Sequence, residues 1–174
     1  MNGLKLNLGA KNTKIKGFKN VDIIKTATTD FVCNVKKLNP FKSASVIEIY
    51  ASHILEHFEW RTEVDEVLKE WNRVLKKGGV LWVAVPDWDV LVKLYLKTGL
   101  MFDDLLAHIY GDGQTAYSLH KTCFTYANLM YHLNQSGFSY VERVVNMPYG
   151  IKDASTLVMQ PIGVRTSLNV KAIK

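Results

Sequence analysis

The stretch Leu4-Lys5-Leu6-Asn7-Leu8-Gly9-Ala10-Lys11-Asn12, continued by Asn20-Val21-Asp22-Ile23, decides the fold. Leucines alternate with polar residues up to Leu8 and are followed by Gly9, which predicts a strand ending in a close turn. A second short apolar run ends at the acid Asp22. These are the elements of a nucleoside site, because a glycine turn admits the ligand and a carboxylate accepts hydrogen bonds from ribose hydroxyls. Taken alone, the same residues also fit an ordinary β-turn followed by a surface acid.

Length and composition indicate one globular domain over residues 1–174, with 48% apolar residues. The two cysteines, Cys33 and Cys123, fit neither a disulfide framework nor a zinc pattern, so we expect a reducing, cytoplasmic compartment. No stretch resembles a signal peptide or approaches the roughly 18 apolar residues of a membrane span. The net charge of +6 comes from scattered lysines, which does not favour nucleic-acid binding.

The rest of the chain alternates between strand and helix patterns. Strands are expected at 31–35, 45–51, 80–85, 139–145, 155–160 and 167–173, and helices at 64–75, 90–96, 100–110 and 126–135. Thr62 and Thr125 are the expected N-caps, and Gly78-Gly79 the expected stop of the first helix. The near-continuous apolar run 80–85 is typical of a strand covered on both faces, whereas the alternation in 167–173 predicts a half-exposed final strand.

These elements predict an α/β fold: a Rossmann-like open sheet, mostly parallel, with an antiparallel C-terminal edge strand and helices on both faces. Only Gly9 to Asn20 joins the first two strands, close to the lower limit of roughly 10–12 residues for a crossover. We therefore expect the first crossover helix to be missing or reduced. The sheet face left bare would be covered by a homodimer or a partner.

In open α/β sheets, ligands bind beyond the carboxyl ends of the strands, near the topological switch point. That rule brings four candidate segments to one rim. They are the turn at Gly9, the acid Asp22, the strand end at Asn34 and the segment Ser52–His57.

The sequences of these segments resemble the small class I S-adenosylmethionine-dependent methyltransferases. The resemblance is greatest to predicted bacterial members with a shortened N-terminus, which are often linked with cell-surface glycan genes. The matching stretches are LKLNLGAKNTKIKGFKNVDI (4–23), IEIYASHILEHF (47–58), EVLKEWNRVLKKGGVLWVAVPD (66–87), IYGDGQ (109–114) and GFSYVERV (137–144). The resemblance implies S-adenosyl-L-methionine as cofactor. It also implies methyl transfer to oxygen or nitrogen of a small-molecule or glycan acceptor.

The resemblance further implies which residues contact the cofactor. Gly9 and Ala10 would face its methionyl part, Asp22 would hold the ribose, and Asn34 stands where the family usually has an aspartate that reads the adenine amino group. The full expected set is Leu8, Gly9, Ala10, Lys11, Asn12, Asp22, Ile23, Asn34, Val35, Ala51, Ser52 and His53. Ala51, Ser52 and His53 would also face the methyl-transfer position.

Methyl transfer requires an acceptor held in line with the methyl group and, for some acceptors, a base. The candidate bases are His53, His57 and His120, with Tyr110 and Tyr117 as candidate positioning groups. The spacing from His53 to His57 is that of HExxH. However, Glu56 falls next to the second histidine and no third ligand follows, so no metal site is expected.

Two other functions stay open. The first is a catalytically silent binding or scaffold protein of the same fold, because Lys11 replaces the second glycine of the family turn and Asn34 replaces the acid. The second is a nicotinamide-dependent Rossmann oxidoreductase. That enzyme would need further glycines after Gly9 and a helix N-terminus facing the pyrophosphate, and the sequence has neither.

Overall fold

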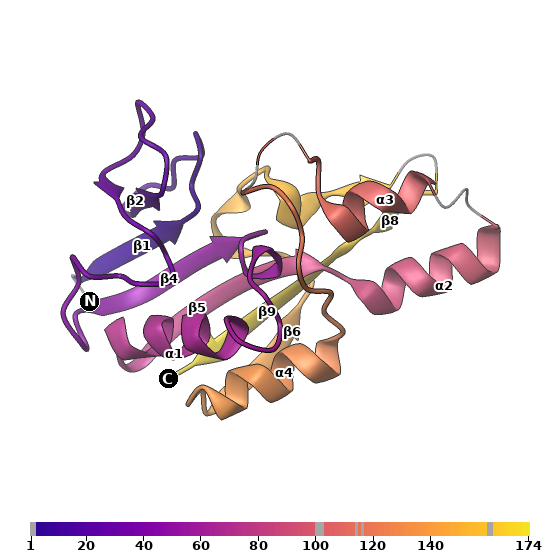
Figure 1. Ribbon diagram of the computed structural model, residues 1–174. Coiled ribbons are helices and arrows are strands. Elements are labelled where there is room, and N and C mark those ends of the chain that lie inside the picture. The colour runs from indigo at the N-terminus through magenta and orange to yellow at the C-terminus, as the bar shows by residue number, and fades with distance from the viewer. Residues whose placement is uncertain (1–2, 100–102, 114, 116, 160–161) are drawn as a thin grey trace.

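The structure, a computed structural model, describes residues 3–99, 103–113, 115, 117–159 and 162–174. Its strands are β1 (Leu4–Leu8), β2 (Lys19–Asp22), β3 (Phe31–Val32), β4 (Val46–Ser52), β5 (Leu75–Pro86), β6 (Tyr140–Val144), β7 (Val158–Met159), β8 (Val164–Arg165) and β9 (Ser167–Ile173). Its α-helices are α1 (Val64–Val74), α2 (Trp88–Thr98), α3 (Asp103–Tyr110) and α4 (Tyr126–Gln135). A seven-stranded sheet in the order β3-β2-β1-β4-β5-β9-β6 forms the body of the molecule (Figure 1).

The sheet confirms the predicted Rossmann-like, mostly parallel fold. β1 pairs in parallel with β2 and β4, and the parallel pairing continues to β3 on one side and to β5 on the other. β9 runs antiparallel to both β5 and β6. The C-terminal strand is therefore the antiparallel one, as expected, although β6 takes the outermost position beside it.

The expectation of a half-exposed final strand is wrong. Leu168, Val170 and Ala172 are fully buried, and Asn169 on the other face is only 2% exposed. The Asn169 amide donates to the carbonyl oxygens of Val145 and Ser155, because the chain between β6 and β7 covers that face. Alternation of polar and apolar residues here reflects a polar contact inside the fold and not exposure to solvent.

The main core lies between the sheet and the helices α1 and α4, which cover one face of it (Figure 1). The apolar stripe of α1 packs against the strands, and its buried members are Val64, Val67, Leu68, Trp71 and Val74. On α4, Leu129 and Leu133 are buried in the same cluster. The predicted cap of α4 is confirmed, since Thr125 forms a capping box with Asn128.

Helix α1 lies where it was predicted, but its predicted N-cap and its predicted stop at Gly78-Gly79 are wrong. Glu63, not Thr62, occupies the N-cap, and the Thr62 hydroxyl instead donates to Glu59. The helix stops at Val74, and the next residue is already extended and paired with Val46 of β4. The sequence Lys76 to Gly79 lies within β5, where Gly78 N–H donates to the carbonyl oxygen of Lys174. Residues 75–79 therefore pair as a strand, in part with the C-terminal Lys174, and do not add a further turn to the helix. Sequence periodicity does not detect this pairing.

Other predicted segments differ in part, and the strand expected at 31–35 covers only Phe31–Val32. The expected helix at 100–110 begins at Asp103 in the structure, and Leu100 to Phe102 lie outside the described residues. The expected strand at 155–160 consists of a 3₁₀ turn, Ala154–Thr156, followed by the short strand β7; Gln160 also lies outside the described residues. Asp153 caps that turn by accepting from the backbone N–H of Ser155, which bends the chain away from a strand.

The first crossover has no helix, as predicted. Its loop is held by two buried asparagines, because the side-chain amides of Asn7 and Asn20 both donate to the carbonyl oxygen of Thr13. The sheet face above this loop is not bare, contrary to expectation. A second apolar cluster covers it, built from Ile15, Phe18, Tyr50, Ala84 and Met147. The chain itself supplies the cover, so the original reason for expecting a homodimer does not hold.

Among the helices in the described part of the chain, none is long and apolar enough to cross a bilayer.

Candidate cofactor site at the switch point

A cavity of about 280 Å³ opens where the strand order reverses, between β1 and β4. Both strands run in the same direction, so their carboxyl ends and the turns that follow them meet there. The cavity is lined by Asn7, Leu8, Gly9, Ala10, Lys11, Thr13, Tyr50, Ser52, His53, Lys152, Asp153 and Ala154. Its position is the one at which open α/β sheets bind their ligands.

The glycine of the first turn is required by its surroundings. Gly9 has φ of +62°, and a Cβ placed there would lie 1.8 Å from Cδ1 of Ile54. Lys11, two residues later, also adopts the left-handed conformation, with φ of 46°. Its side chain is exposed, and the hydroxyls of Thr26 and Thr28 donate to its carbonyl oxygen. Lys11 therefore keeps the backbone shape that a second glycine would give, at some steric cost.

Asp22 lies at the end of β2 and is 7% exposed. One carboxylate oxygen accepts from the backbone N–H of Lys11 at 2.8 Å, and the other from that of Ile24 at 3.0 Å. These bonds tie the acid to the turn that borders the cavity. Each carboxylate oxygen retains a second lone pair, so the group can still accept from a hydroxyl of a bound ribose.

The predicted adenine-reading segment follows β3. The Asn34 side chain is exposed and accepts from the backbone N–H of Lys36, while Val35 points into the core. Helix α1 fixes this loop at two places. The Trp71 indole donates to the carbonyl oxygen of Val35 at 3.0 Å, and the Glu70 carboxylate accepts from the backbone N–H of Leu38 at 2.7 Å.

Glu70 gives the loop an acid-sensitive anchor. Its bidentate contact with Arg73 lowers the pKa of the Glu70 carboxyl, although partial burial opposes that effect. Because the folded pKa is depressed, the stabilisation is present above the ordinary glutamate value of about 4.3 and is lost as pH falls through the folded pKa. We expect Glu70→Gln to lower the free energy of unfolding by about 1–3 kcal/mol at pH 7 and by much less at pH 3. Urea unfolding measures this difference.

The control is Glu66→Gln on the same helix. The Glu66 side chain is 66% exposed, and its contact with Lys36 is long, at 3.6 Å. That change should leave unfolding within about 0.5 kcal/mol of the parent at both pH values. If Glu70→Gln lowered the free energy of unfolding equally at pH 7 and pH 3, Glu70 would not be an acid-sensitive anchor of the loop.

The far wall of the cavity was not predicted from the sequence. Lys152, Asp153 and Ala154 come from the segment after β6, more than 100 residues from the Gly9 turn. The Tyr50 hydroxyl donates to Asp153 at 2.7 Å, and burial raises the pKa of that phenol. No motif marks this segment, so no sequence signal could have identified these residues.

His53 lies on the cavity wall with φ of 53°, a strained conformation of the kind that collects at functional sites. Its Nδ1 is 3.0 Å from Oε1 of Glu56, and its Nε2 is 2.5 Å from the hydroxyl oxygen of Ser167. The serine hydroxyl is also 3.2 Å from the carbonyl oxygen of Ala154. The ring thus joins a buried acid to a serine, with the connectivity of a serine–histidine–acid chain.

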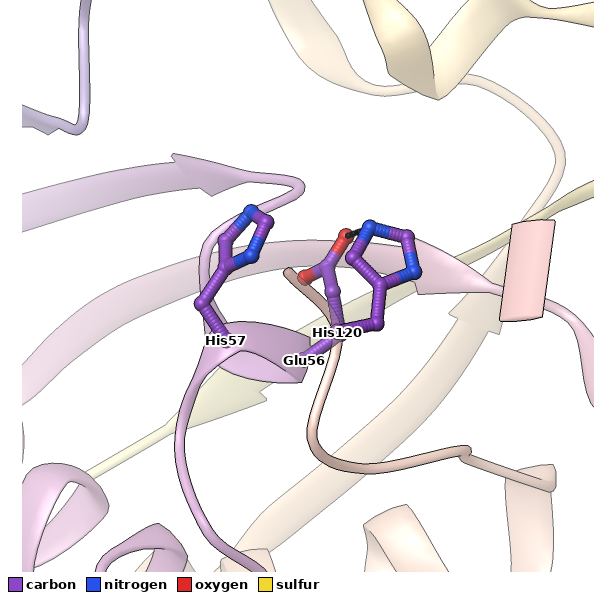
Figure 2. Close-up of side chains that lie close together, drawn as sticks. All are labelled: Glu56, His57 and His120. Carbon is purple, nitrogen blue, oxygen red and sulfur yellow. Dashed lines mark ion pairs between the residues drawn. The ribbon is translucent and has the colours of Figure 1, made fainter. Parts of the chain in front are cut away.

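The other two predicted bases lie away from the cavity lining and gather around Glu56. Figure 2 shows the Glu56 carboxylate between the imidazole rings of His57 and His120. The ring centroids of the two histidines are 5.0 Å apart, and His120 Nε2 lies 3.9 Å from Oε1 of Glu56. Burial opposes ionisation of Glu56, but His53 and His57 outweigh it and hold the pKa of the Glu56 carboxyl below its usual value. Burial lowers the pKa of His120.

The structure thus divides the predicted residues into groups. Those that line the cavity are Leu8, Gly9, Ala10, Lys11, Ser52 and His53. Asp22 borders it through Lys11. Those outside the lining are Asn12, Ile23, Asn34, Val35, Ala51, His57 and His120. Tyr110 and Tyr117 are 58% and 60% exposed and lie outside the cavity as well.

Comparison with known proteins agrees with this fold. A methyltransferase-domain family model matches residues 10–83, from the Gly9 turn into β5. No curated protein matches the chain in sequence. A solved S-adenosylmethionine-dependent methyltransferase from Thermotoga maritima is 17% identical, with a TM-score of 0.60 over 100% of this chain and 83% of that one.

Two further solved structures share the fold. A methyltransferase from Methanosarcina mazei is 18% identical, with a TM-score of 0.60 over 99% of this chain and 92% of that one. The 1,6-didemethyltoxoflavin-N1-methyltransferase of Burkholderia thailandensis, with bound 1,6-didemethyltoxoflavin and S-adenosylhomocysteine, is 16% identical, with a TM-score of 0.62 over 98% of this chain and 70% of that one. At these identities the likeness shows the fold.

Proposed function

We propose that this chain is a class I S-adenosylmethionine-dependent methyltransferase and that it binds the cofactor in the switch-point cavity; its fold and the family match over residues 10–83 support this. The proposed reaction is methyl transfer to oxygen or nitrogen of a small-molecule or glycan acceptor, within enzyme class EC 2.1.1. The observation that carries the proposal is the position of the cavity. It lies between the Gly9 turn and Ser52–His53, and a buried acid is tied to its border.

The cofactor supplies an electrophilic methyl group on a sulfonium. In the proposed arrangement the Gly9 turn faces its methionyl part, and Asp22 accepts from its ribose hydroxyls. The protein's task is to hold an acceptor in line with the methyl and to exclude water, which reduces the entropy cost of reaching the transition state. Tyr50, Asp153 and His53 bring polar atoms to the same cavity and would orient the acceptor.

His53 is the proposed proton acceptor, and the carboxylate of Glu56 supports it from the far side of the ring. In the structure His53 Nε2 contacts Ser167, so an acceptor hydroxyl or amine would have to take the place of that serine. With the cofactor bound, Nε2 of His53 would take the proton that the acceptor hydroxyl or amine loses as its oxygen or nitrogen is methylated. His57 and His120 lie outside the lining and have no step in this scheme.

The proposed location is the cytoplasm, and a homodimer is not part of the proposed mechanism. Cys33 and Cys123 are both free thiols, which suits the reducing environment of the cytoplasm. The expected homodimer now lacks a bare sheet face to support it, and the proposed enzyme needs no partner residue at the cavity.

The proposal is tested by incubating the protein with tritiated S-adenosylmethionine and pools of acceptors, such as nucleotide sugars, oligosaccharides and small amines. We expect label in one pool and a loss of at least about 10-fold in His53→Gln, since a positioned base contributes 10²–10⁴-fold. Binding of S-adenosylhomocysteine without transfer to any pool would instead favour the silent member of the fold. The exposed Asn34 and the strained Lys11 motivate that second candidate.

A further inference from the structure

The cluster of Glu56, His57 and His120 combines a buried acid with two imidazoles outside the proposed cofactor site. Each residue offers one ligand atom, and these atoms all lie within 4.8 Å of one another. Glu56 is fully buried, and neither of its carboxylate oxygens has a hydrogen-bond partner of normal geometry among the described residues. His53 Nδ1 lies 3.0 Å from one of them, without the alignment of a hydrogen bond.

Backbone carbonyls fix the tautomers of both histidines. Nδ1 of His57 lies 3.0 Å from the carbonyl oxygen of Leu119, and Nδ1 of His120 lies 3.0 Å from that of His108. A carbonyl oxygen can only accept, so each Nδ1 carries the proton and each neutral ring has its lone pair on Nε2. This is the arrangement in which metal-binding histidines are usually held, with one ring nitrogen on a carbonyl and the other free for the ion.

As a consequence, two hydrogen-bond acceptors face each other inside the protein, and a cation between them would bind both. The Nε2 lone pair of neutral His120 and the Glu56 carboxylate are both acceptors, and they face each other at 3.9 Å. No proton is available between them in that tautomer. Buried acceptors that lack an aligned hydrogen-bond donor are costly in a protein interior, and a bound cation would satisfy both His120 Nε2 and the Glu56 carboxylate.

Backbone hydrogen bonds hold the two segments that carry the cluster against each other. The N–H groups of Lys121 and Thr122 donate to the carbonyl oxygen of Glu56, and the Thr122 hydroxyl donates to that of Phe58. These bonds join the 3₁₀ turn Leu55–His57 to the distant loop that carries His120. The third ligand that sequence spacing did not supply therefore comes from another part of the chain.

We infer that Glu56, His57 and His120 form a binding site for a divalent transition-metal ion of the zinc class. Two imidazoles and one carboxylate suit Zn²⁺ or Co²⁺ and do not suit Mg²⁺, which prefers oxygen ligands. At zinc–nitrogen distances of about 2.1 Å, two ligand atoms on one ion are at most about 4.2 Å apart. The widest pair, up to 4.8 Å in the structure, has to close by up to about 0.6 Å. His57 is partly exposed and gives the ion a route in.

The test titrates ZnCl₂ into tag-free protein that has been treated with a chelator, followed by calorimetry and by thermal unfolding. We expect one equivalent bound with a dissociation constant at or below the micromolar range, together with a rise in melting temperature. Millimolar MgCl₂ should not compete. His120→Ala and Glu56→Gln should each weaken binding by about 100-fold or more. His132→Ala, which removes a histidine paired with the single acid Asp65, is the matched control and should bind as the parent does.

A second readout needs no variant and so does not depend on altered chains folding. In nitrogen-15 spectra of the parent, Zn²⁺ should shift Nε2 of two of the five histidines, and assignment should place them at His57 and His120. Absence of zinc binding at 100 µM would overturn the inference, and so would shifts confined to other histidines. The inference does not depend on the proposed methyl transfer, because neither readout involves the cofactor.

Discussion

Asp22→Ala should lower the affinity for S-adenosylhomocysteine by about 100-fold or more. In the proposed complex the carboxylate accepts from two ribose hydroxyls, and hydrogen bonds to a charged group contribute about 1.5–3 kcal/mol each. The loss of two such bonds corresponds to at least two orders of magnitude in the dissociation constant. The change also removes the bond from Lys11 N–H, which loosens the turn beside the cavity. Isothermal calorimetry measures the effect.

Asp30→Ala provides the matched control for this experiment. Asp30 is also an acid near β2 that accepts from a backbone N–H, that of Asn20, but it lies away from the switch-point cavity. Its removal should cost some stability and leave the affinity for S-adenosylhomocysteine within about 3-fold of the parent. Equal losses in the two variants would mean that Asp22 acts through the fold and not through the ribose.

Trp71→Ala should produce the largest loss of stability, about 3–5 kcal/mol in the free energy of unfolding. Trp71 is fully buried in α1, and its removal opens a cavity beneath the sheet. It also leaves the carbonyl oxygen of Val35 without its indole donor. For a domain of this size the expected fall in melting temperature is about 6–20 °C. Calorimetric or circular-dichroism melts measure it.

Two further variants separate the parts of this effect. Trp71→Phe keeps most of the buried area but loses the hydrogen bond. It should therefore lower the free energy of unfolding by less than half as much as Trp71→Ala does. Trp60→Ala removes a tryptophan that is 52% exposed and should change stability by no more than about 0.5 kcal/mol. A similar loss for Trp60→Ala and Trp71→Ala would contradict the assignment of Trp71 to the core.

The sheet could be predicted from local patterns where the chain itself carries the signal. Alternating leucines ending at Gly9, the continuous apolar run after Gly79 and the apolar stripe of α1 each specify an element, and the order of elements specifies the class of fold. The absence of a first crossover helix also followed, because the loop between β1 and β2 is too short to hold one.

Where prediction failed, distant contacts decided the outcome. The end of α1 depends on pairing with Lys174, and the burial of Asn169 depends on the segment after β6. The cover over Tyr50 comes from Met147, almost 100 residues away. Local periodicity contains no information on such contacts, so it misjudged the C-terminal stop of α1 and the exposure of one strand and one sheet face.

The candidate site shows the same division. Gly9, Ser52 and His53 could be brought together from strand order alone, since parallel strands end at one edge. The opposite wall at Asp153 and the partnership of His120 with Glu56 required the full chain path. The roles proposed for all of these residues remain predictions for experiment.

The most direct test of the central proposal is a calorimetric titration of the unaltered protein with S-adenosylhomocysteine, with NADH as the comparison ligand. The proposed cavity predicts one site with a micromolar dissociation constant for the sulfur nucleoside and no detectable heat with NADH. An absence of heat and of any thermal shift with 1 mM S-adenosylhomocysteine would contradict it.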